Sequence, residues 1–358
     1  MRSVDYDPAS GVTTIGAGVK SYDVHTALAR DGRSIATGTC PTVGAAGLTL
    51  GGGLGVDTRR YGLSCDGLTE LTMVTADSLV RTVGEGEEAD LLWASRGGGG
   101  GNFGVVTSMS FRTHPAEARG IFALSFGWEH AAAVVKGWAA RVQGMARSTW
   151  CNVRLEVGVD GSTRVSVGGC CQPGDQHDEV LALERAIGVE AMSVSTSEKS
   201  FMDSVRYFGG GSTTPRYAAV SGSDVVASMT ETLAQALPQI VRRRASSGTV
   251  SRVFLDPLTG AAQDLPANAT AFPWRRHLAE VQWSVQLASD PTRAGVRSAR
   301  GWVNGAHQTL GSESVGAYVN RLEPGRLLSD YYGANIDRLH RIKAQIDPTG
   351  FFRSPYTL

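Results

Sequence analysis

A glycine-rich run over residues 38–55 holds the residue types best suited to chemistry in this chain. Seven of its eighteen residues are glycine, and a cysteine, Cys40, stands directly before Pro41. Glycine lets the backbone approach a ligand closely or adopt positive φ, and the N–H groups that it leaves uncovered can bind phosphate or a planar ring. A thiol beside such a site could bond covalently to the ligand. The alternative is a set of tight turns with Cys40 as a small buried side chain.

A second glycine motif, Gly99-x-Gly101-x-x-Gly104, has the spacing of a dinucleotide-binding fingerprint. That fingerprint requires a helix after its last glycine. Here the β-rich run Val105–Phe111 follows instead, which excludes a Rossmann-type site. The sequence has no Walker A run and no nucleophile elbow. Its five cysteines lack zinc-binding spacing, so we expect no metal site.

Composition and charge narrow the range of partners. The 34 basic and 34 acidic residues balance, which argues against nucleic acid or an acidic membrane surface as a partner. No apolar run is long enough to span a membrane, and no signal peptide stands at the start, so we expect a cytoplasmic protein. The residues give no indication of oligomeric state.

The predicted secondary structure that positions these motifs differs between residues 10–115 and residues 120–310. Residues 10–115 are rich in short apolar and β-branched runs. These runs predict strands at Val12–Ile15, Leu68–Ala76 and Gly104–Phe111, with an amphipathic helix at Ser21–Asp31 between them.

The sequence pattern of residues 120–310 predicts hairpins and helices. A further helix is predicted at Asn335–Gln345 in the tail. The predicted strands are Ile121–Trp128, Val153–Val159, Arg164–Gly168, Thr249–Phe254 and Leu278–Leu287, and the predicted helices are Ala131–Ala146, His177–Ala186 and Asp224–Arg243. This alternation fits an antiparallel sheet covered by helices on one face.

Several segments, in order along the chain, resemble the berberine-bridge-enzyme-like FAD-linked oxidases of the vanillyl-alcohol-oxidase superfamily. Together they extend from about Val12 to Phe352. The matching segments are Cys40–Gly44, Gly51–Gly55, Arg60–Leu63, Asp66–Thr75, Asp90–Ala94, Arg96–Thr107, Tyr331–Asn335, Arg338–Leu339, Ile342–Lys343 and Asp347–Pro348.

The resemblance implies an α+β fold with a discontinuous arrangement of domains. A PCMH-type FAD-binding domain is expected at residues 1–117, a substrate domain with a helix-covered antiparallel sheet at 118–313, and a tail at 314–358 that returns to the FAD domain. Met1–Asp7 resembles the strand that follows the family's first βαβ subdomain, whose loop carries a flavin-bonding histidine. We therefore expect a truncated start and weak FAD binding. His25, with no glycine-rich neighbours, is interpreted as an ordinary helix residue.

The implied reaction is oxidation of an alcohol, sugar or natural product. A hydride would pass from carbon to flavin N5, a base would take the hydroxyl proton, and O2 would reoxidise the flavin. Partners would be a small-molecule substrate and O2. The alternative is a flavin-less remnant without catalytic activity, acting as a binding or scaffold protein or without function. The yellow colour of bound flavin in the purified protein would distinguish the FAD-linked oxidase from the flavin-less remnant.

The resemblance also assigns roles to individual residues. Cys40 would bond to C6 of the flavin ring. Tyr318 is a candidate catalytic base, with a structural role for its ring as the alternative. It lies in a Tyr-x-Asn motif that relatives often follow with a second tyrosine. If that second tyrosine is the usual base, it is lost here, because Arg321 stands at its position. Arg321 could instead lower the pKa of a neighbouring phenol. The residues expected to hold FAD are Cys40, Pro41, Thr42, Val43, Gly44, Gly47, Gly51, Gly52, Gly53, Gly55, Gly101, Asn102, Gly104, Val105, Val106 and Asn335.

Four further residues are expected near the flavin or the substrate. Gln282 and Trp283 occupy a strand position that faces substrate in relatives, but alternation places them on opposite faces, so at most one faces the flavin. Trp283 fits core packing better. Tyr331 and Tyr332 are candidate catalytic residues in the returning tail, with core packing of their rings as the alternative.

Overall fold

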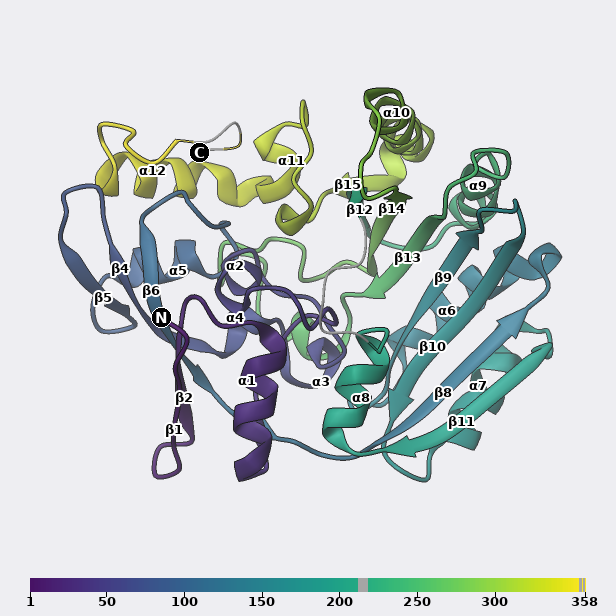
Figure 1. The fold of residues 1–358 in the computed structure, drawn as a ribbon, viewed down its shortest axis with the longest axis horizontal. Coiled ribbons are helices and arrows are strands. Elements are labelled where there is room, and N and C mark those ends of the chain that lie inside the picture. The colour runs from purple at the N-terminus through teal and green to yellow at the C-terminus, as the bar shows by residue number, and fades with distance from the viewer. Residues whose placement is uncertain (212–217, 354–355, 357) are drawn as a thin grey trace.

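The fold is taken from a computed structural model, which describes residues 1–211, 218–353, 356 and 358. Two antiparallel sheets form its body (Figure 1). Strands of the smaller sheet are β1 (Val4–Asp7), β2 (Val12–Gly16), β4 (Leu68–Val74), β5 (Val80–Gly84) and β6 (Val105–Arg112), in the order β1-β2-β6-β4-β5. The three strands predicted for this region are confirmed.

Helices from both ends of the chain pack on the smaller sheet. Those that follow its strands are α1 (Ser21–Leu28), α2 (Ala45–Leu50), α3 (Thr58–Tyr61), α4 (Ser64–Gly67) and α5 (Ala89–Ser95), and those of the tail are α11 (Leu328–Tyr332) and α12 (Ile336–Ile346). Ile15, Met109, Tyr332 and Leu339 share one apolar core, so residues more than 300 positions apart bury each other. Figure 1 shows α12 above β4, β5 and α5, with α11 beside it toward the centre of the molecule.

The larger sheet runs β11-β8-β10-β9-β13-β14-β12-β15. Its strands are β8 (Arg119–Phe126), β9 (Trp150–Val157), β10 (Thr163–Cys171), β11 (Ser193–Lys199), β12 (Ala218–Val226), β13 (Ser251–Pro257), β14 (Ala279–Leu287) and β15 (Ser314–Gly316). The helices α6 (Ala131–Gln143), α7 (Gln176–Ile187), α9 (Glu231–Arg242) and α10 (Arg293–Leu310) cover one face. The predicted helix-covered antiparallel sheet is confirmed.

Short elements complete the described chain. They are α8 (Phe201–Phe208), the two-stranded ladder of β3 (Arg33–Ser34) and β7 (His114–Pro115), and the 3-10 turns Ala29–Asp31, Trp128–His130, Gly260–Gln263, Gly311–Glu313, Val319–Arg321 and Gly333–Asn335. No helix among the described residues is both long and apolar enough to cross a membrane.

The helix predicted from Asp224 is wrong at its start. Asp224 belongs to β12, which pairs with β14 over nine residues, and the helix begins only after Thr230. The Thr230 hydroxyl accepts the Leu233 N–H at 3.1 Å and so caps α9. Apolar residues occur both at the end of β12 and along α9, so the sequence pattern alone predicts one continuous helix across the two elements. Strands β11 and β12 and helices α8 and α10 were not predicted.

The buried side chain of Arg59 connects the two sheets. From α3 it donates hydrogen bonds to the carbonyl oxygens of Val142 (2.6 Å), Met145 (2.9 Å) and Thr149 (2.7 Å), at and beyond the end of α6. The residue is 1% exposed. Because carbonyls at a helix C-terminus lack internal partners, a guanidinium satisfies several of them at once.

Candidate active site

A cavity of about 480 Å³ opens between the glycine-rich run and the face of the larger sheet opposite α6, α7, α9 and α10. That volume is in the range of small-molecule sites, about 300–1,000 Å³. The run contributes Gly38, Thr39, Cys40, Val43, Gly44, Gly47, Leu48, Leu54 and Gly55, the sheet contributes Trp150, Asp256, Pro257, Glu280 and Gln282, and the tail contributes Tyr318, Asn320 and Arg321.

The glycines of the run serve two different purposes. A Cβ added at Gly44 or Gly47 would meet no atom within 4 Å, so both positions leave the cavity open. At Gly55 an added Cβ would collide with the Thr37 carbonyl oxygen, so this glycine is needed for packing. The wall at Gly44 and Gly47 therefore fits a planar ring laid against backbone, as an FAD site requires.

Cys40 carries an exposed, free thiol on this cavity. The other four cysteines are buried, and burial raises the pKa of Cys65, Cys151, Cys170 and Cys171, to about 12 for Cys151 and Cys171 and about 11 for Cys170. A buried, protonated thiol is a poor nucleophile. Cys40 is thus the accessible thiol among the five.

Other predicted cofactor residues in the first segment lie around the cavity without lining it. Pro41, Thr42 and Gly51–Gly53 are outside its lining. An added Cβ at Gly51 would clash with the side chain of Asn320, and Gly53 has a φ of +89°. Gly51 and Gly52 thus bring the run up against Asn320 and Tyr318 of the tail.

Tyr318 is buried at the cavity with its hydroxyl oxygen surrounded by donors. It accepts hydrogen bonds from Gly53 N–H (2.9 Å), Leu54 N–H (3.2 Å) and Asn320 Nδ2 (2.7 Å). Burial nevertheless raises the pKa of Tyr318 to about 12, although Arg321 acts to lower it. A phenol with a raised pKa is poorly suited to take a proton at neutral pH.

Two carboxyl groups on the sheet face the same cavity, buried Glu280 and partly buried Asp256, and neither was predicted. Glu280 stands opposite Asp256 in the pairing of β14 with β13. Burial raises the pKa of both, to about 7 for Glu280. Gln282, two residues after Glu280, lines the cavity too and accepts a hydrogen bond from Arg321 Nη2 at 2.7 Å. Alternation from Gln282 was the signal that could have revealed Glu280.

Trp283 faces the helices on the other side of the sheet. Its ring is fully buried and meets Trp302 edge-on at 5.6 Å between centroids. Its Nε1–H donates to Asp224 Oδ2 at 2.7 Å. Of the predicted substrate pair, the structure brings only Gln282 to the cavity.

Tyr331, Tyr332 and Asn335 are buried in the tail and are outside the cavity lining. The Tyr331 hydroxyl accepts a backbone N–H at 2.8 Å from the loop before α11, and the Tyr332 hydroxyl donates to Gly98 O at 2.8 Å. The Asn335 amide donates to carbonyl oxygens of the loop 267–271. These contacts fix the tail against its surroundings.

The second glycine motif, including Gly101 and Val106, also lies outside the cavity lining. Asn102 is buried, and its amide donates to Gly98 O at 2.9 Å, while Gly104 packs closely against Val74 O. Val105 is 54% exposed.

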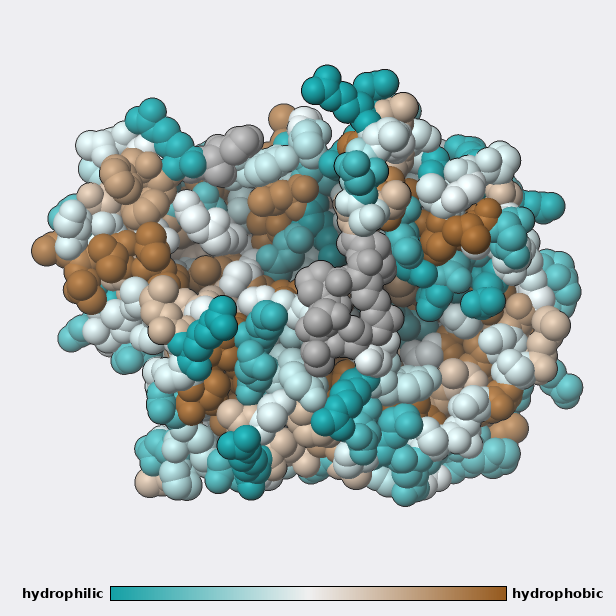
Figure 2. All heavy atoms as spheres, in the orientation of Figure 1, coloured by the Kyte–Doolittle hydropathy of each residue, from teal (hydrophilic) through white to brown (hydrophobic). Residues whose placement is uncertain are grey.

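Figure 2 shows hydrophobic residues gathered at the left edge of the molecule, over β5, where Leu79 and Val80 are also exposed.

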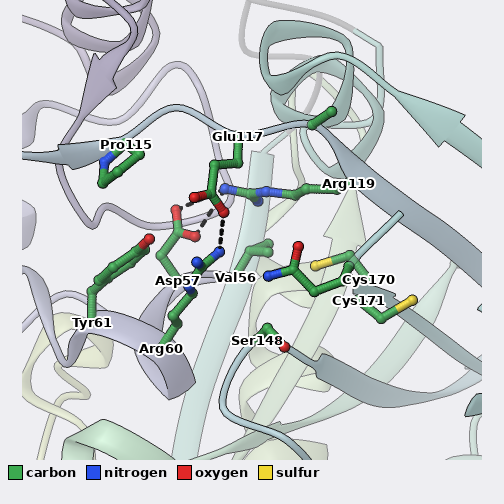
Figure 3. A pocket seen from close by; sticks show the side chains of 12 residues that line it. Val56, Asp57, Arg60, Tyr61, Pro115, Glu117, Arg119, Ser148, Cys170 and Cys171 are labelled. Carbon is green, nitrogen blue, oxygen red and sulfur yellow. Dashed lines mark hydrogen bonds and ion pairs between the residues drawn. The ribbon is translucent and has the colours of Figure 1, made fainter. Parts of the chain in front are cut away.

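A small polar pocket lies beside α3, between the start of β8 and the end of β10. It encloses only about 20 Å³, room for about one water molecule. Figure 3 shows that its charges are paired, Asp57 with Arg119 at 2.8 Å and Arg60 with Glu117. Its size and its satisfied charges make it a structural support.

His25, on α1, supports the residues just before the glycine-rich run. Its ring nitrogens are 2.8 Å from Ser34 Oγ and from Thr37 Oγ1. Burial lowers the pKa of His25 to about 4, so the ring is neutral. The helix residue predicted here is in fact a buried polar link to the glycine-rich run.

A charged cluster, called the tail clamp, holds the segment that carries Tyr318. His307 on α10 contacts Asp224 Oδ2 through Nδ1 at 2.7 Å and Glu323 Oε2 through Nε2 at 2.9 Å. Arg326 Nη2 lies 3.0 Å from Asp224 Oδ1. Burial alone would lower the pKa of His307, but the two carboxylates outweigh it and raise the pKa to about 9.

Comparisons with known proteins agree with this geometry. Residues 1–84 match the family FAD binding domain, and residues 317–356 match the family described as berberine and berberine like. The FAD-linked oxidoreductase YgaK of Bacillus subtilis is 30% identical over 99% of this chain and 78% of its own length. A xylooligosaccharide oxidase of Thermothelomyces thermophilus is 29% identical over 99% of this chain and 76% of its own.

Solved structures give the same result. The glucooligosaccharide oxidase of Acremonium strictum superposes with a TM-score of 0.89 at 25% identity, covering 100% of this chain and 79% of the other. Berberine bridge enzyme from Eschscholzia californica superposes with a TM-score of 0.86 at 18% identity, covering 99% of this chain and 78% of the other, and supports the fold alone.

Among the described residues, no group of three or more His, Cys, Asp or Glu could hold a metal ion.

Proposed function

The chain belongs to the berberine-bridge-enzyme-like family of FAD-linked oxidoreductases, and on that premise we propose that it oxidises a hydroxyl-bearing carbon of a carbohydrate. Its cofactor is FAD, which when bound supplies the hydride acceptor and the link to dioxygen. The xylooligosaccharide and glucooligosaccharide oxidases named above are carbohydrate oxidases by name. Simple alcohols and natural products form the wider class to be tested beside carbohydrates.

The observation that carries the proposal is the pairing of an open backbone wall with a polar wall across one cavity. Gly44 and Gly47 would support the flat ring, and Cys40 Sγ would attach it covalently, since its thiol is exposed on the same wall. We further propose that Gly101 and Val105, outside the cavity, contact the ADP portion of the cofactor.

The opposite wall suits a polyhydroxyl substrate. Arg321 offers donors, Gln282 offers both a donor and an acceptor, and the carboxyl groups of Asp256 and Glu280 offer acceptors. A sugar hydroxyl both donates and accepts hydrogen bonds, so several of these groups could orient it at once. An apolar alcohol would leave buried polar groups unpaired, at roughly 1–3 kcal/mol each.

Anaerobic mixing of the FAD-loaded protein with a panel of compounds tests the proposal. We expect an oligosaccharide to bleach the flavin, and expect an aliphatic alcohol of similar size to react at least tenfold more slowly. Admission of air should then restore the colour with release of hydrogen peroxide. Bleaching by the aliphatic alcohol at an equal rate would contradict carbohydrate specificity, and no bleaching by any hydroxyl compound would contradict the oxidase function.

A further inference from the structure

Glu280 is a buried carboxyl group with an unfilled acceptor on the cavity wall. The residue is 1% exposed, and its Oε1 has no hydrogen-bond partner among the described residues. The nearest cation, Arg321 Nε, lies 3.5 Å away and makes no hydrogen bond to it. A buried carboxylate oxygen without a donor is costly, so this atom is suited to a donor brought by a ligand.

Asp256, which is partly buried, presents a second carboxyl group directly opposite. It is the register partner of Glu280 across β13 and β14, and directly opposed side chains have Cβ atoms roughly 5 Å apart. Asp256 Oδ1 accepts a hydrogen bond from Asn152 Nδ2 at 3.0 Å, from β9. Two neighbouring carboxyl groups do not both ionise easily, because each negative charge disfavours the other.

The charges around this pair are few. Arg321, from the tail, is the cation that faces it, Tyr318 lies nearby, and the register partner of Glu280 on β12 is the apolar Val225. The pKa of both carboxyl groups is raised by burial. The pair therefore has the capacity to hold a proton near neutral pH.

The other titratable residues that line the cavity are less suited to accept a proton. Tyr318 already accepts three N–H donors and has a pKa of about 12. Arg321 cannot accept a proton. Cys40 is assigned to the cofactor, which leaves Asp256 and Glu280.

We infer that Glu280 is the general base of the proposed oxidation and that Asp256 is a positioning residue that sets its protonation. The inference rests on the proposed function. The Glu280 carboxylate would take the substrate O–H proton, and the electron pair of that bond would form the C=O bond. FAD, when bound, would accept the hydride from the neighbouring C–H bond. Hydride and proton together reduce dioxygen to hydrogen peroxide, so atoms and electrons balance.

The test compares Glu280→Gln with a matched control, Glu156→Gln. Glu156 is also a buried glutamate on the sheet face that lines the cavity, but it is held by Arg154 and Arg252 and lies outside the cavity lining. General bases contribute about 10²–10⁴-fold to rate. We expect anaerobic flavin reduction to fall by that factor in Glu280→Gln, and to stay within a few-fold of the parent in Glu156→Gln.

The pH profile separates a base from a structural residue. The rate of the parent protein should rise as the pH passes about 7, where Glu280 ionises. Glu280→Gln should lose that rise. Asp256→Asn removes the neighbouring carboxyl group and should move the midpoint of the rise to lower pH. An unchanged midpoint in Asp256→Asn would contradict the coupling.

Infrared spectroscopy gives a readout without substrate. At pH 6 we expect a protonated-carboxyl band that disappears in Glu280→Gln, persists in Glu156→Gln and titrates near pH 7. If Glu280→Gln reduces its flavin as fast as the parent, the base assignment is overturned while the oxidase function stands. If no hydroxyl compound reduces the parent flavin, the proposed function is overturned and the base role with it.

Discussion

The tail clamp makes the stability of this protein depend on the protonation of His307. Protonated His307 lies between Asp224 and Glu323, both nearly fully buried, and its side chain is 20% exposed. Its pKa is raised from 6.5 to about 9 in the folded protein. Because the folded protein holds this proton more tightly than the unfolded chain does, the contribution is fully present below pH 6.5. It is lost as the pH rises through about 9.

The size of the effect follows from the two pKa values. A shift from 6.5 to about 9 corresponds to roughly 3 kcal/mol, at about 1.4 kcal/mol for each pH unit. The parent protein and His307→Gln should therefore differ in their free energy of unfolding by an amount that depends on pH. We expect the advantage of the parent to be roughly 3 kcal/mol larger at pH 6 than at pH 10.

Urea unfolding at a series of pH values measures this difference directly. His340→Gln provides the control, since His340 is exposed on α12, and its difference from the parent should stay nearly constant with pH. A difference between parent and His307→Gln that does not change between pH 6 and pH 10 would refute the reasoning, because the histidine would then not be held as a cation by the two carboxylates.

Three further predictions concern single side chains. Cys40→Ala should abolish covalent flavin attachment while Cys65→Ala keeps it, as flavin fluorescence on denaturing gels would show; attachment surviving in Cys40→Ala would remove this assignment. Arg59→Met leaves buried carbonyls without donors, at about 1–3 kcal/mol each, so its urea midpoint should fall clearly, and an unchanged midpoint would argue against Arg59 as a link. Tyr318→Phe leaves the Gly53 N–H unpaired and should slow flavin reduction less than Glu280→Gln does. The midpoint of its pH–rate profile should equal that of the parent protein, and a shifted midpoint would favour Tyr318 as the base.

The sequence predicted features that depend on local pattern. Glycine density marked the wall at Gly44 and Gly47, and strand alternation separated Gln282 from Trp283. Both depend on spacing along one segment, which the sequence displays directly.

Features that depend on distant partners were missed. Asp256 and Glu280 lie 24 positions apart and become neighbours only through the register of β13 and β14. Asp224 was assigned to a helix because the contacts that satisfy it in a strand come from His307 and Arg326, far along the chain. No local pattern predicts such contacts.

Equilibrium titration with FAD tests the central claim, that the Gly44–Gly47 wall holds the flavin. A Cβ at Gly47 would meet no atom within 4 Å, and Gly47 lines the cavity, so Gly47→Leu should fold normally and bind FAD at least tenfold more weakly than the parent. Gly301→Leu, at an exposed helical glycine with equal space, should bind FAD like the parent. Equal FAD affinity in all three proteins would contradict the placement of the cofactor in this cavity.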